Sequence, residues 1–379
     1  MTKAEKAVPE ATVPNIVQET VPKPPSRIVW IDYARFIGIW LVVYAHSGVT
    51  DDLWRFFSVV VLQILVFLSG YLEKNNKTVL QSITGGCRSI LLPYALLYAV
   101  AYVYWFVIDF IFHIDMYTFE PRESGPVVFT LLKPVIGMLL GQGTYESTYS
   151  MMLVFPMWFM PALFFVRVYH SIIIAFSGDS LKRYCLGVAV LLLVILGLNI
   201  FETRFFRIPF GVDCGLLLYP FFAFGNVVRR MNFISKMKPP VGVPGIALHL
   251  LVAAVGFAFI WIAIPYNGTA DVNVFYFGEN LILYVLLGYA GIISVLAIAL
   301  LFNKPDPICS RISTGTLLIM AYHGILIPYI NRLALIFNME FNNWSVILLS
   351  ILNVGLFIIP IGIVQRYFPI LIGGRKSGA

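Results

Sequence analysis

The sequence predicts an all-α integral membrane protein: a bundle of about ten transmembrane helices around a polar internal cavity, with both termini in the cytoplasm. Hydrophobic residues make up 59% of the 379-residue chain and charged residues only 12%. Soluble domains have roughly 45–50% apolar and about 25% charged residues, so this chain has too few charges to cover a surface in water. Apolar stretches also recur at about the 20-residue length that crosses a bilayer.

The expected elements begin after residues 1–27, which alternate Pro, Val, Glu, Lys and Thr without the apolar run of a secretory signal. This segment is predicted to be a disordered cytoplasmic tail. Ten apolar stretches then predict membrane-spanning helices, and their even number places both termini on the same side. They are residues 29–48, 54–72, 89–113, 156–176, 184–201, 212–229, 243–264, 280–302, 314–337 and 344–365. A short basic tail, 371–379, follows.

Segment 127–141 (VVFTLLKPVIGMLLG) is apolar but too short for an ordinary span, and it contains Lys133 and Pro134. It is predicted to be a re-entrant or interfacial helix. If it crosses the membrane, the number of spans becomes eleven and every later loop changes side.

The distribution of positive charge predicts the orientation. In the ten-span arrangement, 18 of the 26 Lys and Arg residues lie on the side of the N-terminus, six lie on the other side, and Arg35 and Arg167 lie inside helices. Because cytoplasmic loops carry the excess of Lys and Arg, both termini are expected in the cytoplasm. The net charge of +7 is therefore attributed to membrane topology, and no nucleic-acid partner is expected.

The first predicted helix carries Asp32, Arg35 and His46, although charge inside a bilayer is costly. Asp32 and Arg35 are three residues apart and can pair on one helical face. His46 lies 11 residues beyond Arg35, about 16 Å along the helix and on nearly the same face. A guanidinium can hold a phosphate or a polarised carbonyl, and an imidazole can remove a proton from an attacking hydroxyl. The alternative is an interfacial ion pair and an ordinary residue at the helix end.

These residues resemble the opening signature of the membrane-bound acyltransferase-3 family, in which an Arg and a His separated by ten residues lie on the first transmembrane helix. Five further segments resemble family motifs in the expected order, so the similarity extends over about residues 28–370. They are 66–71 (VFLSGY), 88–94 (RSILLPY), 157–164 (MWFMPALF), 220–226 (PFFAFGN) and 321–323 (AYH).

The resemblance implies a transmembrane acyltransferase domain over residues 28–370. It implies transfer of an acyl group, usually acetyl from acetyl-CoA, to a hydroxyl of a surface polysaccharide, lipid-linked glycan or glycolipid. His46 would be the general base, Arg35 would bind the donor, and Asp32 would complete the catalytic set. Arg88 would also contact the donor, but many relatives carry two arginines three apart where this chain has one. The chain ends soon after the tenth helix, which favours the sugar O-acetyltransferase branch.

Four further residues are candidates for acceptor binding. Trp158 could stack on a sugar ring, although Trp is also enriched at membrane interfaces. Tyr322 and His323 lie within a predicted helix, where an unpaired imidazole would be costly. Glu146 lies in the long loop 114–155, which is predicted to be non-cytoplasmic. An acidic loop residue suits carbohydrate hydroxyls, but a solvated loop explains it equally well.

No group of His, Cys, Asp and Glu has metal-ligand spacing, so no metal is expected. No bound cofactor is expected. Acyl-CoA is the expected partner, with acetyl-CoA as the co-substrate. The other expected partners are a carbohydrate or glycolipid acceptor and the lipid bilayer of a bacterial cytoplasmic (inner) membrane, and the oligomeric state stays open. Two rival interpretations remain: a transporter or flippase of a polysaccharide precursor, and a non-catalytic membrane subunit.

Overall fold

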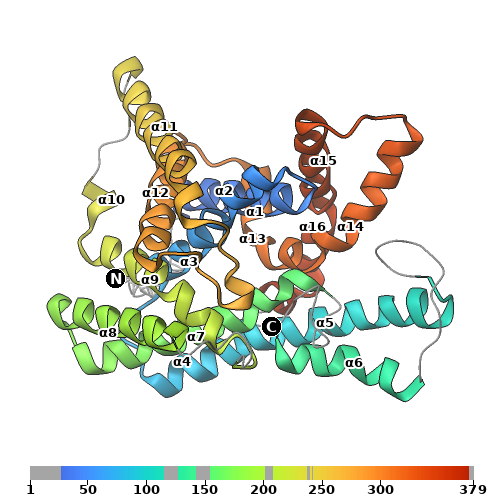
Figure 1. Ribbon diagram of the computed structural model, residues 1–379, viewed down its shortest axis with the longest axis horizontal. Coiled ribbons are helices and arrows are strands. Elements are labelled where there is room, and N and C mark those ends of the chain that lie inside the picture. The colour runs from blue at the N-terminus through green and yellow to red at the C-terminus, as the bar shows by residue number, and fades with distance from the viewer. Residues whose placement is uncertain are drawn as a thin grey trace, which may run out of the picture.

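The computed structural model describes residues 27–114, 127–141, 154–200, 208–236, 240 and 242–374. Within these ranges the chain forms helices, and the only β pairing is a single bridge between Asp271 and Tyr276. The all-α fold predicted from composition is therefore confirmed. Figure 1 shows the helices arranged as a broad bundle, with α1–α3 near its centre.

Eight helical segments in the described ranges are long and apolar enough to cross a membrane. Each overlaps one of the predicted stretches. They are Asp51–Leu72, Val79–Ile111, Phe155–Ser177, Leu181–Asn199, Gly242–Asn267, Leu281–Ala299, Thr316–Ile336 and Asn343–Tyr367. The remaining two predicted stretches coincide with α1 (Val29–His46) and α9 (Val212–Arg230), which contain 18 and 19 residues but carry charged side chains. The number of crossings and the side of the termini stay predictions.

Several spans are built from more than one element. The span after α1 consists of α2 (Asp51–Ser58) and α3 (Val61–Leu72), and the next joins α4 (Val79–Gly86) and α5 (Leu92–Trp105) through π-helical turns. The later long helices are α7 (Phe159–Ser177), α8 (Leu181–Ile200), α11 (Gly242–Asn267), α12 (Leu281–Ala299), α14 (Thr316–Ile336), α15 (Asn343–Leu356) and α16 (Ile358–Tyr367). Short helices α10 (Phe233–Lys236) and α13 (Pro307–Thr314) connect them.

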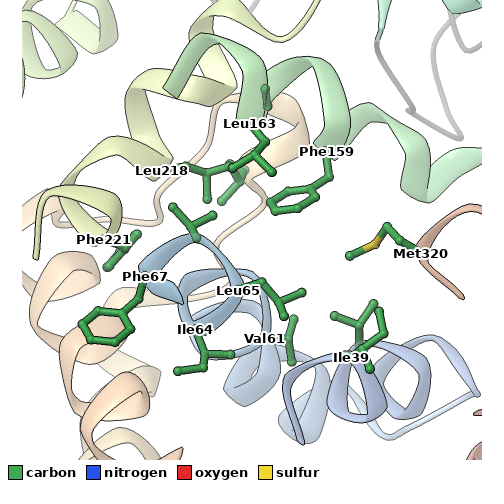
Figure 2. Packing of buried hydrophobic residues seen from close by; sticks show 14 of the residues in the cluster. Ile39, Val61, Ile64, Leu65, Phe67, Phe159, Leu163, Leu218, Phe221 and Met320 are labelled. Atoms are coloured by element: carbon green, nitrogen blue, oxygen red, sulfur yellow. The ribbon is translucent and has the colours of Figure 1, made fainter. Parts of the chain in front are cut away.

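The core lies where α1, α3, α7, α9 and α14 meet. Figure 2 shows Ile39 of α1, Leu65 of α3, Phe159 of α7 and Met320 of α14 converging there, and all are buried. By contrast, α8 and α11 bury little of their apolar surface inside the protein. In a bilayer these outer helices face lipid, which suits their uniformly apolar sequences.

The tightest helix pair is α3 with α9, and small residues make it possible. A Cβ added at Gly70 of α3 would collide with the carbonyl oxygen of Phe222, and one added at Gly225 of α9 would collide with that of Phe67. Backbones of membrane helices approach this closely only where Gly or another small residue lies at the contact. The VFLSGY and PFFAFGN motifs therefore have a packing role, because each supplies one glycine of this contact.

The segment predicted to be re-entrant or interfacial forms α6 (Val127–Leu140), a 14-residue helix with Pro134 inside it. At 1.5 Å per residue it is about 21 Å long, shorter than the roughly 30 Å hydrocarbon core. It lies beside α5 (Figure 1), because three tyrosines of α5 at intervals of four donate hydrogen bonds to α6 carbonyls. These bonds join Tyr94 to Met138, Tyr98 to Pro134 and Tyr102 to Leu131, at 2.7, 2.7 and 3.1 Å.

Candidate active site

Two histidines that are far apart in the sequence lie against each other. The ring centroids of His46, the last residue of α1, and His323, in α14, are 5.1 Å apart in an edge-to-face arrangement. His323 is fully buried, whereas His46 is half-buried. The structure thus brings together the predicted base and one of the predicted acceptor-binding residues.

Backbone hydrogen bonds set the tautomer of both rings. Nδ1 of His46 lies 2.8 Å from the carbonyl oxygen of Val42, and Nδ1 of His323 lies 2.8 Å from that of Ile319. Because a carbonyl oxygen only accepts, each Nδ1 must carry the proton, and in a neutral ring Nε2 then has the free lone pair. Nε2 of His323 is buried without a hydrogen-bond partner. The two imidazoles therefore offer unprotonated nitrogens, as proton acceptors require.

Aromatic side chains surround His46. Trp54 of α2 and Phe155, which begins the 3₁₀ turn Phe155–Trp158 before α7, pack edge-on to its ring at centroid distances of 5.6 and 6.2 Å. Trp158 in the same turn is buried and packs edge-to-face with Phe159. The predicted contact of Trp158 with a sugar stays a prediction, while Phe155 and Trp54 are the aromatic residues that contact His46.

Residues around His323 hold α14 in place. The hydroxyl of Tyr322 donates a 2.7 Å hydrogen bond to the carbonyl of Leu97 in α5, and the amide of Asn353 in α15 donates a 3.1 Å bond to the carbonyl of His323. Oδ1 of Asn353 is buried without a partner. Tyr322 therefore positions α14 in this structure, and its predicted contact with the acceptor stays a prediction.

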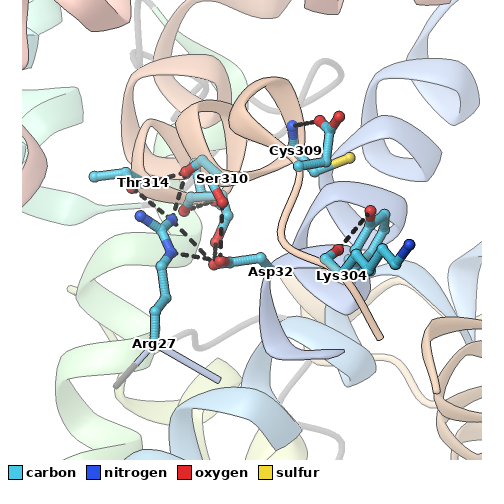
Figure 3. Close-up of polar contacts among 10 residues, drawn as sticks. Arg27, Asp32, Lys304, Cys309, Ser310 and Thr314 are labelled. Atoms are coloured by element: carbon cyan, nitrogen blue, oxygen red, sulfur yellow. Dashed lines mark hydrogen bonds and ion pairs between the residues drawn. The ribbon is translucent and has the colours of Figure 1, made fainter. Parts of the chain in front are cut away.

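The carboxylate of Asp32 is bound by side chains other than that of Arg35. Its carboxylate forms an ion pair with Arg27 and accepts hydrogen bonds from Ser313 at 2.7 Å and Ser310 at 3.2 Å, both on α13 (Figure 3). Arg27 also donates to the hydroxyl of Thr314 at 3.0 Å. An i,i+3 pair with Arg35 offers only a few tenths of a kcal/mol, whereas a buried carboxylate needs several donors. The hydroxyls of α13 supply those donors.

Arg35 is left without a direct partner. It makes no hydrogen bond or ion pair within the described residues, although its charge interacts with those of Asp32, Arg27 and Arg167. Arg167 lies on α7, where its Nε is 3.5 Å from a carboxylate oxygen of Glu73 and its Nη1 is 3.4 Å from the hydroxyl of Ser89. Arg88, the other predicted donor contact, is exposed in the turn next to Ser89.

The two predicted residues of α1 face the same neighbouring span. Arg35 lies within electrostatic reach of Arg167, in the middle of Phe155–Ser177, and His46 packs on Phe155 at the start of that span. The spacing of 11 residues separates Arg35 and His46 by about 16 Å along α1. That both residues share one face of the helix stays a prediction from this spacing.

Three other observations concern the extent of the site. Glu146 lies outside the described residues. Among the described residues, no group of three His, Cys, Asp or Glu is arranged to hold a metal ion. A cavity of about 170 Å³ lies between α9, α10, α11 and α12, where its lining is almost wholly apolar and includes neither His46 nor Arg35. We place the candidate site at His46, His323, Arg35 and Arg167, because the lining of that cavity has almost no polar or titratable groups.

Sequence reasoning missed the surroundings of Arg35. Arg167 was recognised only as a charge inside a helix, yet such charges are functional candidates by default, so its sequence signal was available. Glu73 and Ser89 had no such signal, because only the packing of α3, α7 and the turn before α5 brings them to Arg167.

Comparisons with known proteins find one matching family. A family model described as an acyltransferase domain matches residues 28–362, a range that contains His46, Arg35 and His323. Neither curated proteins nor solved structures provide a match.

Proposed function

Because the chain belongs to the acyltransferase-3 family, whose model covers residues 28–362, we propose that it transfers an acyl group from acyl-CoA to a hydroxyl of a carbohydrate. The family and the eight apolar helices make it a multi-pass membrane acyltransferase. Acetyl is the proposed acyl group, and a surface polysaccharide or lipid-linked glycan is the proposed acceptor. The proposed location of the protein is a bacterial inner membrane.

One observation carries the proposal: the proton on Nδ1 of His46 is held by the Val42 carbonyl, which leaves Nε2 as the basic nitrogen. Such a nitrogen can take the proton of a sugar hydroxyl as the oxygen attacks the thioester carbonyl. Collapse of the tetrahedral intermediate then breaks the carbon–sulfur bond. The thiolate of coenzyme A leaves and takes the proton from His46, so the products are an ester and a free thiol.

His323 has a supporting role in this mechanism. Its unpartnered Nε2 lies in a ring that contacts His46, so it can accept a hydrogen bond from the acceptor and orient the attacking oxygen. A near-attack geometry of this kind lowers the barrier by fixing the reacting atoms before the chemical step.

Arg35 acts at a distance from the reacting carbon. About 16 Å of helix separates it from His46, so it cannot contact both the thioester and the base. That separation suits a donor with its anionic nucleotide at one end and its thioester at the other end of a long pantetheine arm. Arg35 is therefore proposed to hold the nucleotide end, on the predicted cytoplasmic side.

The test is acyl transfer by the purified full-length protein in lipid nanodiscs. We expect acetyl-CoA to release free thiol when surface polysaccharide from cells lacking the gene is added, with radiolabelled acetate appearing in the polysaccharide. Mass spectrometry of glycans from cells with and without the gene identifies the modified sugar. A transporter or flippase gives neither thiol release nor a change in acetylation, and that result would exclude the proposal.

A further inference from the structure

The charges around Arg167 leave Arg35 without a paired carboxylate, and they leave Arg167 sharing the carboxylate of Glu73 with Lys77. Asp32 is engaged by Arg27, and Glu73 forms its closest ion pair with Lys77. The 3.5 Å separation between Glu73 and Arg167 is too long for a good hydrogen bond, and Nε of Arg167 is buried without a hydrogen-bond partner. Arg35 has no ion pair in the described part of the chain.

Adding these charges gives an excess of two positive charges. The positive groups are Arg27, Arg35, Lys77 and Arg167, and the negative groups are Asp32 and Glu73. Burying a positive charge without a counter-ion is costly, because no ion pairing offsets the loss of its hydration free energy. An anion that enters this region would therefore be attracted by two guanidiniums whose hydrogen-bonding capacity is largely unused.

Elements from two other parts of the chain hold Arg167 in place. Glu73 lies at the end of α3, and its carboxylate faces both Lys77 and Arg167. Its side chain is only 8% exposed. Ser89, in the turn that leads into α5, accepts the hydrogen bond from Nη1. A guanidinium held from two sides presents its planar fork in a fixed direction, which is the arrangement that binds phosphate well.

We propose that Arg167 forms, together with Arg35, the site for a phosphate group of the donor's nucleotide, and that Glu73 is the residue that positions Arg167. This inference rests on the proposed acyl-CoA donor. Arg167 lies 12 residues from Phe155 along the same span, about 18 Å, and Phe155 packs on His46. The phosphate site and the basic nitrogen thus lie about 16–18 Å apart along one pair of helices, α1 and the span Phe155–Ser177.

The experiment compares two thioesters that differ only in the nucleotide. Acetyl-CoA carries the phosphates, whereas S-acetylpantetheine has the same thioester arm without them. For Arg167→Gln in nanodiscs of zwitterionic lipid, we expect the KM for acetyl-CoA to rise about tenfold or more, the effect of losing a charge-assisted hydrogen bond. We expect the KM for S-acetylpantetheine and kcat to stay within about twofold. Arg167→Lys should recover part of the affinity, because it restores the charge without the fork.

Two further variants define the position of the site. Arg183→Gln removes an exposed positive charge from α8, so it is the matched control and should leave both KM values unchanged. Glu73→Gln should raise the KM for acetyl-CoA alone. In the double variant with Arg167→Gln, the KM for acetyl-CoA should be little higher than in Arg167→Gln alone. Both substitutions remove the same interaction, so their effects are not additive.

The alternatives give different results. Equal losses with the two thioesters would show a structural role for Arg167, and an unchanged KM for acetyl-CoA would remove it from the donor site. A lipid phosphate is the other source of such an anion. If anionic vesicle lipid raises the thermal stability of the wild type but not of Arg167→Gln, and the KM values are unchanged, the site binds headgroups and the proposal is wrong. Wild-type protein inactive with both thioesters contradicts the proposed function instead.

Discussion

The rings of His46 and His323 meet edge to face with centroids 5.1 Å apart, and each ring is fixed by a hydrogen bond from Nδ1 to the carbonyl four residues before it. The same backbone interaction thus leaves Nε2 free on both rings. One histidine ends α1 and the other lies within α14, so neither helix alone forms this pair. Its formation depends on the packing of these two helices around the core of the bundle.

Replacing His46 with Gln should abolish most of the acyl transfer. Glutamine keeps polarity and approximate size but cannot take a proton, so kcat should fall by about 10²–10⁴-fold. The KM for acetyl-CoA should change little, because Arg35 lies about 16 Å away along α1. Steady-state thiol release by purified protein measures both constants. Wild-type turnover by this variant would favour the rival non-catalytic subunit, in which His46 serves only as a polar contact.

Replacing His323 with Leu should separate stability from activity. The buried Nε2 has no partner, so an apolar side chain removes an unsatisfied group and should leave the melting temperature equal or higher. Acyl transfer should fall at least tenfold if Nε2 orients the acceptor. Tyr322→Phe is the matched control on the adjacent residue. It removes the hydrogen bond to the Leu97 carbonyl and should cost about 0.5–1.5 kcal/mol of stability with little loss of turnover.

The sequence was sufficient to predict the helices because their signals are local. Composition and the length of each apolar stretch located every long helix in the described parts of the chain, including α1 and α9, whose polar residues make them less obvious spans. The short length of α6 was also evident, because the apolar stretch covers only residues 127–141, and it contains Lys133 and Pro134. The tyrosine hydrogen bonds that attach α6 to α5 were not predicted, since they depend on how two helices align in space.

The site was predictable only where one helix contains the pattern. Arg35 and His46 share a face because their spacing is close to three full turns. The spacing showed only that Asp32 can pair with Arg35 three residues away, and it did not reveal that Arg27 and the serines of α13 bind the carboxylate. A contact between residues nearly 280 positions apart leaves no periodic trace in a single sequence.

Gly70→Ala and Gly225→Ala should each disrupt assembly of α3 against α9. A methyl group at either position meets a backbone carbonyl of the other helix, which cannot move aside as a flexible side chain could. We expect a loss larger than the 1–3 kcal/mol typical of overpacking, seen as a lower melting temperature or as aggregation in detergent. Gly197→Ala in α8 is the control, because its Cβ would meet nothing within 4 Å. If Gly70→Ala melts like that control, the close contact between α3 and α9 is wrong.

Cys309 should react slowly with alkylating reagents because its thiol is hard to ionise. It lies on α13, where burial, followed by the adjacent carboxylate of Asp306, raises the pKa of the thiol to about 11. The thiolate is the reactive form. At pH 8 an ordinary thiol with a pKa near 8.5 is about 24% ionised, whereas one with a pKa of about 11 is roughly 0.1% ionised. A thiolate of higher pKa is also more nucleophilic, which offsets part of this difference. Alkylation by iodoacetamide at pH 8 should therefore be at least about tenfold slower than that of a small free thiol, and its rate should still rise about tenfold per pH unit between 8 and 10.

Asp306→Ala provides the matched comparison for Cys309. The substitution removes the carboxylate that accepts a 2.8 Å hydrogen bond from the Cys309 amide and raises the pKa of its thiol. The pKa should fall toward its usual range, and alkylation at pH 8 should accelerate, as followed by mass spectrometry of the peptide. Loss of the N-terminal cap also exposes the residue, which increases the rate in the same direction. Hydrogen exchange of the α13 amides separates these effects, because acceleration without faster exchange can come only from the lost charge.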